Sequence, residues 1–168
     1  MNDSTSKKIV IVEDNVSLAD IYKTRLELIG YTCFIAYNGI TGLYFIQQEI
    51  PDLVLLDLMI PDIPGVQVLE TMRNSAWGKT IKTLIISNLN ESDVPTDLRQ
   101  LGIEGYVVKA NMVDDQIDQL VNAVFASHNA EPVPQTVWLY ERRTLGKTPF
   151  ATFQYNFSRI TQTSCPIV

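Results

Sequence analysis

The stretch Leu53-Val54-Leu55-Leu56-Asp57 decides how the chain folds. Four consecutive apolar residues are typical of a strand that is covered on both faces, and such strands occur in parallel sheets flanked by helices. The run ends in an acid, and a carboxylate at the end of a buried strand costs free energy unless it is paired or binds a metal. The stretch therefore predicts a buried parallel strand that delivers Asp57 to a site.

Further short apolar runs alternate with segments of helical periodicity on both sides of this strand. Strands are predicted at 9–12, 32–36, 53–56, 83–86 and 105–108, and helices at 15–29, 39–50, 65–74, 93–101 and 113–125. The apolar stripe of the first helix consists of Leu18, Ile21, Tyr22, Leu26 and Ile29. This alternation predicts an α/β fold, a five-stranded parallel sheet with helices on both faces.

Polar side chains follow four of the five predicted strands: Glu13, Asp14, Asp57, Ser87 and Lys109. Every crossover in such a sheet is right-handed, so the carboxyl ends of the strands meet at one edge, where ligands collect. Three carboxylates gathered there repel each other, and a hard divalent cation such as Mg²⁺ relieves the repulsion. The sequence therefore predicts a magnesium site beside Asp57, with Lys109 as a second positive group and Ser87 as a neutral donor.

The combination and order of these polar residues resemble those in the receiver domain of bacterial two-component response regulators. The resemblance covers roughly Lys7 to Ser127. Its motifs are the acidic pair Glu13-Asp14, the stretch Asp57-Leu58-Met59-Ile60-Pro61 with Gly65 following, the hydroxyl residue Ser87, and Tyr106 three residues before Lys109. The resemblance implies the flavodoxin-like, doubly wound (βα)5 fold of the CheY-like family.

The resemblance also assigns roles to these residues. The implied metal ligands are Asp14 and Asp57 directly, Glu13 through water, and the backbone carbonyl of Met59. Asp57 is the implied phosphoacceptor, Lys109 pairs with the phosphoryl group, Ser87 moves toward it and Tyr106 turns inward. The fourth helix, the last strand and the last helix form the implied output surface. Such a domain catalyses its own phosphorylation and slow hydrolysis without being a turnover enzyme.

Four residues bear on how closely the chain follows the family. Ala110 stands where the family commonly has a proline, and Asn88 stands where it prefers a small residue, so the shape of the last loop and the access of phosphate are open. Met59 and Leu89 occupy the positions that, in the family, tune how fast the phosphoryl group is lost to water. Both are apolar, which disfavours the placement of an attacking water. We therefore predict a long-lived phosphorylated state.

Composition narrows the class of protein. Residues 1–129 carry 9 Lys/Arg and 17 Asp/Glu, a balance of −8, and residues 130–168 carry 4 and 2, a balance of +2. An acidic domain is a poor partner for nucleic acid, because that affinity rests on clustered Lys and Arg. The sequence also lacks an apolar run of the roughly 18–20 residues that cross a membrane, so a cytoplasmic location is expected, with Cys33 and Cys165 as reduced thiols.

The predicted domains are a receiver over 1–129 and a C-terminal extension over 130–168. The extension begins with a linker, Glu131 to Pro134, and its later alternation of apolar and polar residues is compatible with a marginal two-stranded hairpin. Implied partners are a sensor histidine kinase or histidine phosphotransfer protein and a downstream protein target; a second copy of the chain stays open. The alternatives are a Mg²⁺-dependent phosphohydrolase that uses Asp57 as nucleophile and a non-phosphorylated pseudo-receiver scaffold.

Overall fold

The computed structural model describes residues 6–89, 96–112 and 116–126. These residues form one five-stranded parallel sheet with the strand order β2-β1-β3-β4-β5. The strands are β1 (Lys8–Val12), β2 (Thr32–Ala36), β3 (Leu53–Leu56), β4 (Lys82–Ser87) and β5 (Gly105–Val108). The α-helices are α1 (Val16–Leu28), α2 (Gly39–Glu49), α3 (Gly65–Asn74) and α4 (Gln116–Ala126). This confirms the predicted flavodoxin-like α/β architecture.

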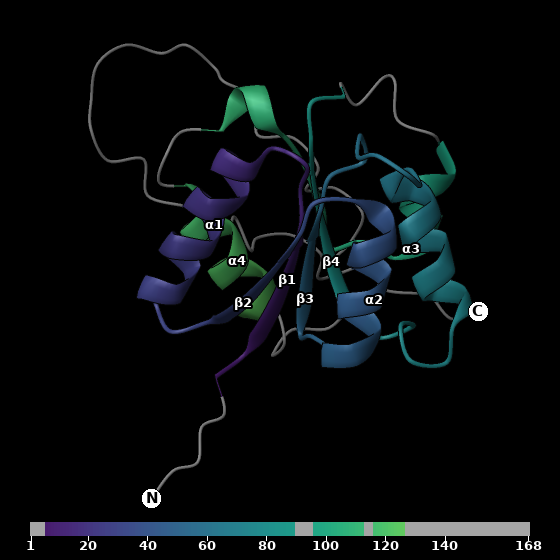
Figure 1. Cartoon of the computed structure of the whole chain (residues 1–168), viewed down its shortest axis with the longest axis horizontal. Helices are drawn as coiled ribbons and strands as arrows, with labels where there is room; N and C mark the ends of the chain where they lie inside the picture. Colours follow the sequence, from purple (N-terminus) through teal and green to yellow (C-terminus); the bar gives the residue numbers. More distant parts are fainter. Residues whose placement is uncertain (1–5, 90–95, 113–115, 127–168) are drawn as a thin grey trace, which may run out of the picture.

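Within the described residues, each face of the sheet is covered by two α-helices. In Figure 1, α1 and α4 lie on one side of the strands and α2 and α3 on the other. Alternate side chains of β1 serve the two layers: Ile9 and Ile11 belong to the core under α1 and α4, whereas Val10 and Val12 belong to the core under α2 and α3. An apolar run without alternation is therefore the pattern that a central strand of this fold requires.

Two helices begin at asparagine caps. The side chain of Asn15 accepts a hydrogen bond from the Leu18 N–H at 3.1 Å, and that of Asn38 accepts one from the Thr41 N–H at 2.8 Å. Such caps satisfy backbone donors that have no partner within the first helical turn. They fix where the chain turns from the ends of β1 and β2 into the helices.

Two predicted core residues of α1 are wrong. The helix buries Ala19, Tyr22 and Leu26, spaced three and four residues apart, against the sheet. Ile21 is 52% exposed, and Ile29 is 45% exposed. The helix is covered by the sheet along one narrow stripe, so apolar residues that flank this stripe remain in contact with solvent.

The described part of the predicted fourth helix is a 3-10 helix rather than an α-helix. It is labelled η2 and spans Thr96–Leu101, while residues 93–95 lie outside the described residues. Gly102, which follows this segment directly, has a positive φ of 66°, a conformation that ends a helix. The described segment is short, and short helical segments commonly adopt 3-10 geometry.

The chain that follows β5 also departs from the expected pattern. Lys109–Asn111 form one further 3-10 turn, η3, which the Met112 N–H closes by donating to the Lys109 carbonyl at 3.0 Å. The last helix, predicted from 113, is described from Gln116, because residues 113–115 lie outside the described residues. The predicted extension over 130–168 lies outside them as well. None of the described helices combines the length and apolarity needed to cross a membrane.

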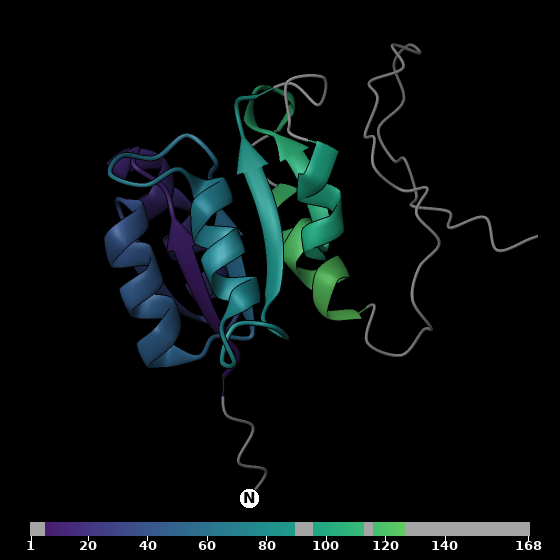
Figure 2. The same ribbon diagram turned by 90° about the vertical axis from the view of Figure 1, so that its right-hand side faces the viewer.

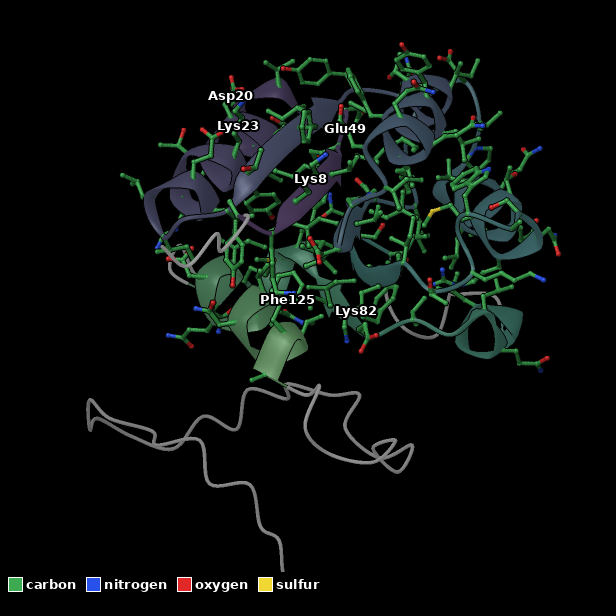
Figure 3. The ribbon with its side chains drawn as sticks, turned by 90° about the horizontal axis from the view of Figure 1, so that it is seen from below. Lys8, Asp20, Lys23, Glu49, Lys82 and Phe125 are labelled. Atoms are coloured by element: carbon green, nitrogen blue, oxygen red, sulfur yellow. The ribbon has the colours of Figure 1, made fainter. Side chains whose placement is uncertain are left out.

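The edge where the strands begin carries paired charges. Figure 3 views this edge, with Lys8 beside Glu49, and the two side chains form an ion pair at 2.9 Å. Lys82 pairs with Glu104 at 3.2 Å. Each of these two acids is therefore neutralised by one lysine.

Candidate functional site: an acidic cluster at the carboxyl edge of the sheet

The carboxyl ends of the strands bring distant acids together. Figure 2 shows the arrows of β1 and β4 running to the same end of the molecule. The Glu13 N–H donates to the Ala36 carbonyl and the Asp57 N–H to the Val12 carbonyl, both at 3.0 Å, which continues the strand ladders one residue further. One carboxylate oxygen from each of Glu13, Asp14 and Asp57 lies within 4.8 Å of the others. The predicted convergence of the three acids is confirmed.

Asp57 is the buried centre of this cluster. Its side chain is 4% exposed, and its two oxygens have different partners. Oδ1 accepts hydrogen bonds from Ser87 Oγ at 2.7 Å and from the Met59 N–H at 3.0 Å. Oδ2 forms an ion pair with the Lys109 ammonium group. A buried carboxylate is stable only with such partners, and here three of the predicted site residues, Ser87, Met59 and Lys109, supply them.

Lys109 bridges two acids at once. Besides Asp57, its Nζ lies 2.5 Å from Glu13 Oε2, and its side chain is 9% exposed. Burial lowers the pKa of Lys109, but the hydrogen bonds and charges of Asp57 and Glu13 outweigh burial, so the pKa rises above its ordinary value. Lys109 is therefore held as a cation at neutral pH.

The pKa of Glu13 is displaced mainly by loss of solvent. Burial raises it above its ordinary value, with the neighbouring charge of Asp57 acting in the same direction, while Lys109 and the N–H of Asn15 oppose the rise. Within the described residues, Lys109 thus pairs with two of the three clustered carboxylates, the buried Glu13 and Asp57, while Asp14 is exposed. The cluster retains an excess of negative charge that favours a cation.

A divalent cation fits the donor chemistry of the cluster. All three candidate ligands offer carboxylate oxygens, the donors that hard cations prefer, and Asp14 is exposed, so solvent reaches the group from that side. Glu13, Asp14 and Asp57 can therefore hold a metal ion. The role of the Met59 carbonyl as a further ligand stays a prediction, because the contact seen at Met59 is made by its N–H.

Ser87 and Tyr106 occupy different positions relative to the cluster. Ser87 is fully buried and touches Asp57. The hydroxyl of Tyr106, on β5, donates instead to the carbonyl of Leu89 at 2.7 Å, and its ring packs against the core under α2 and α3. Ser87 thus ends β4, and Tyr106 contacts the segment that follows it at Leu89. The movement of these two predicted switch residues stays a prediction.

The sequence predicts Tyr22 as part of the apolar stripe of the first helix but not as a neighbour of the acids. Tyr22 on α1 is 6% exposed, and its hydroxyl lies 3.7 Å from the Met112 sulfur in the loop after Lys109. Burial raises the pKa of Tyr22 well above its ordinary value, and the charges of Glu13 and Asp57 add to the rise. The sequence offered one signal for this position. Tyr22 lies on the apolar stripe of the helix that follows Glu13-Asp14, and the hydroxyl of a buried tyrosine usually contacts a polar partner.

Comparison with known proteins agrees with this geometry. A family model described as the response regulator receiver domain matches residues 9–124. The "Probable transcriptional regulator ycf27" of Guillardia theta is 36% identical over 106 residues, which cover 62% of this chain and 40% of that relative. The chain thus matches less than half the length of this curated relative.

Solved structures share the fold. The chemotaxis response regulator CheY4 of Vibrio cholerae superposes with a TM-score of 0.66 at 20% identity, covering 71% of this chain and 99% of that one. The Mn²⁺-bound form of response regulator Rcp1 superposes with a TM-score of 0.59 at 26% identity, covering 76% and 97%. The second of these similar proteins carries a divalent metal.

Proposed function

Because the chain belongs to the family of response regulator receiver domains of two-component systems, we propose that Asp57 is the residue that accepts its phosphoryl group. The observation that carries the proposal is the surroundings of this carboxylate: it is buried, its oxygens contact Ser87 and Lys109, and Glu13 and Asp14 lie beside it. This combination suits a group that is chemically modified rather than a simple strand-end acid.

The proposed reaction is transfer of a phosphoryl group to Asp57. A carboxylate oxygen of Asp57 forms a bond to phosphorus while the bond between phosphorus and the donor breaks, and the donor leaves with the bond electrons and takes up a proton. Mg²⁺, held by Glu13, Asp14 and Asp57, would supply charge neutralisation for the phosphoryl oxygens. Lys109 exchanges part of its ion pair with Asp57 for a phosphoryl oxygen, and the hydroxyl of Ser87 donates to another.

Signalling follows from the same contacts. Movement of Ser87 toward the phosphoryl group removes its bond to Asp57 Oδ1 and frees space beside Tyr106, which exchanges its hydrogen bond to Leu89 for an inward position. The surface of η2, β5 and α4 then changes its affinity for a downstream protein. The proposed donor is a sensor histidine kinase or a histidine phosphotransfer protein in the cytoplasm.

Other functions receive less support. A phosphohydrolase that uses Asp57 as nucleophile usually has a second acid two residues later, where this chain has Met59, an apolar residue that is exposed. A scaffold without phosphorylation would have no need for a lysine that bridges two buried acids. The domain is therefore proposed to modify itself and to hydrolyse the product slowly, without turnover of a substrate.

Intact mass spectrometry tests the proposal directly. The full chain is incubated with acetyl phosphate and Mg²⁺, and the wild type is expected to gain one phosphoryl group. Asp57→Asn should gain none, whereas Asp20→Asn, which changes an exposed acid on α1, should behave like the wild type. Equal phosphorylation of Asp57→Asn and the wild type would rule out Asp57 as the acceptor.

A further inference from the structure

Arg73, in the last turn of α3, connects three segments of chain. Its guanidinium group uses all five N–H donors, and each acceptor is an uncharged oxygen. The acceptors are the carbonyls of Leu101 (2.6 Å), Gly78 (2.8 Å), Ile81 (3.0 Å) and Gly102 (2.8 Å) and the hydroxyl of Thr83 (3.1 Å). They belong to the end of η2, the loop after α3 and the start of β4.

Such an arrangement depends on arginine. Burial lowers the pKa of Arg73, with the charge of Glu104 opposing, yet a guanidinium stays charged under all ordinary conditions. A planar fork of fixed donors can reach acceptors on three sides, whereas the ammonium group of a lysine has three donors on a flexible stem. Arg73 thereby ties the end of η2 firmly to α3, which lies beside it in Figure 1.

The opposite end of α3 rests on the chain at Asp57. The Gly65 N–H donates to the Leu58 carbonyl at 3.0 Å, and a Cβ at Gly65 would lie 2.1 Å from the Asp57 carbonyl oxygen. Between its two ends the helix buries Val68 and Leu69 in the core. A packed helix in contact at both ends transmits a displacement as a rigid body.

The start of β5 lies directly after the segment that Arg73 holds. The Glu104 N–H donates to the Thr83 carbonyl at 2.8 Å, and Thr83 is also one of the acceptors of Arg73. Tyr106 follows two residues later. A displacement of the Leu101 and Gly102 carbonyls would therefore reach the strand that carries the proposed switch residue.

We propose that α3 is a lever between Asp57 and the start of β5, with Arg73 as the positioning residue at its far end. A change at Asp57 shifts the backbone of 57–65, moves α3, and pulls residues 101–106 through Arg73. This route runs beside the one through Ser87 and Tyr106. The inference rests on the proposed phosphorylation of Asp57 and adds a second connection from that residue to the same face.

Amide hydrogen exchange with and without acetyl phosphate and Mg²⁺ tests the lever. In the wild type, phosphorylation is expected to change exchange at residues 101–106 by about fivefold or more, the lower end of typical coupling between sites. In Arg73→Lys the change should fall below about twofold by the same measure. Arg25→Lys, which perturbs the 3.0 Å ion pair with Asp118 on the opposite face of the sheet, should keep the wild-type change.

Thr83→Val is a milder second variant. It removes one of the five acceptors of Arg73 within an unchanged volume, and its response should lie between those of the wild type and Arg73→Lys. Intact mass is recorded for every sample. A wild-type response in phosphorylated Arg73→Lys, or no response at 101–106 in the phosphorylated wild type, overturns the lever alone. A wild type that gains no phosphoryl group overturns the proposed function, and the lever falls with it.

Discussion

Gly65 is the residue at which the functional loop comes closest to a helix. Its backbone lies so near Asp57 and Leu58 that no side chain fits. The sequence motif contains this glycine, but only the packing of α3 against the end of β3 explains it. Replacement of Gly65 therefore bears on both stability and site geometry.

Gly65→Ala should destabilise the protein by about 3 kcal/mol, because the new methyl group would overlap backbone atoms that cannot move aside. Urea unfolding measures the change. Gly30→Ala is the control: its φ of 100° imposes strain, but nothing lies within 4 Å of the added carbon, so a loss of about 1 kcal/mol is expected. A smaller loss for Gly65→Ala than for Gly30→Ala would contradict the close approach.

Met59 and Leu89 should slow the loss of the phosphoryl group. Met59 is exposed two residues after Asp57, and Leu89 follows Ser87 by two residues; neither side chain offers a polar group that could hold a hydrolytic water. The double variant Met59→Asn, Leu89→Glu should dephosphorylate about tenfold faster or more, since polar groups can position and activate that water. The rate is read from intact mass after removal of the donor.

The control for this rate is Ile40→Asn, which places a polar residue at an exposed apolar position of α2. It should dephosphorylate like the wild type. A double variant with an unchanged or slower rate would show that the two apolar residues do not protect the phosphoryl group.

Cys33 should be an unreactive thiol. Burial raises its pKa from 9.0 to about 12, so at pH 8 nearly all of it is protonated, and the thiolate is the reactive form. In a Cys165→Ser variant, labelling by a thiol reagent at pH 8 should be about a thousandfold slower than in urea. The neutral thiol stabilises the fold below pH 9.0, and this contribution is lost as the pH rises toward 12. Equally fast labelling of folded and unfolded protein would contradict burial of Cys33.

At the scale of elements, the bounds of the strands follow from the sequence more closely than those of the helices. The four-residue run of β3 is bounded by Pro51-Asp52 and Asp57, so its ends are evident. The buried stripe of α1 is less evident, because hydropathy alone does not say how wide a face of the helix the sheet covers. Ile21 and Ile29 are apolar but lie outside the buried face. Propensity and pattern define an element, whereas its partners define its buried face.

Asn38 should contribute measurably to stability through α2. Its side chain accepts from both the N–H and the hydroxyl of Thr41, each at 2.8 Å, at the point where the chain leaves β2. Asn38→Ala should cost about 1 kcal/mol in urea unfolding, the usual value of an N-terminal cap. Asn38→Ser retains an acceptor and should recover most of this loss; equal stabilities of the Ala and Ser variants would rule out a capping role.

The convergence of the acids could be predicted from the sequence because it depends only on topology. Any right-handed parallel sheet brings the residues after its strands to one edge, and Glu13, Asp57 and Lys109 are such residues. Tyr22 and Arg73 depend instead on how α1 and α3 pack against loops far away in the chain. The hydrogen-bond acceptors of Arg73 are mostly backbone carbonyls, and that of Tyr22 is a thioether sulfur. Acceptors of these kinds cannot be recognised from the sequence.

At the scale of the whole molecule, uncompensated charge at one edge of the sheet links metal binding to folding. Mg²⁺ should raise the free energy of unfolding, by about 1.4 kcal/mol at a concentration ten times its dissociation constant. Thermal unfolding in EDTA and in MgCl₂, with NaCl matching the ionic strength, measures this shift. Asp14→Asn should lose most of it and Asp20→Asn should keep it. An equal shift in all three proteins would point to general charge screening by an acidic chain.

The central position of β1 in the sheet has a consequence for folding during protein synthesis. Its residues Ile9–Val12 align with Cys33–Ala36 on one side and with Leu53–Leu56 on the other. During synthesis, β1 therefore lacks one of its two neighbours until the residues of β3 have been translated. Until then one edge of this apolar strand stays unpaired, and transiently exposed apolar segments and unpaired strand edges of this kind are prone to aggregate, which is why chaperones act during synthesis.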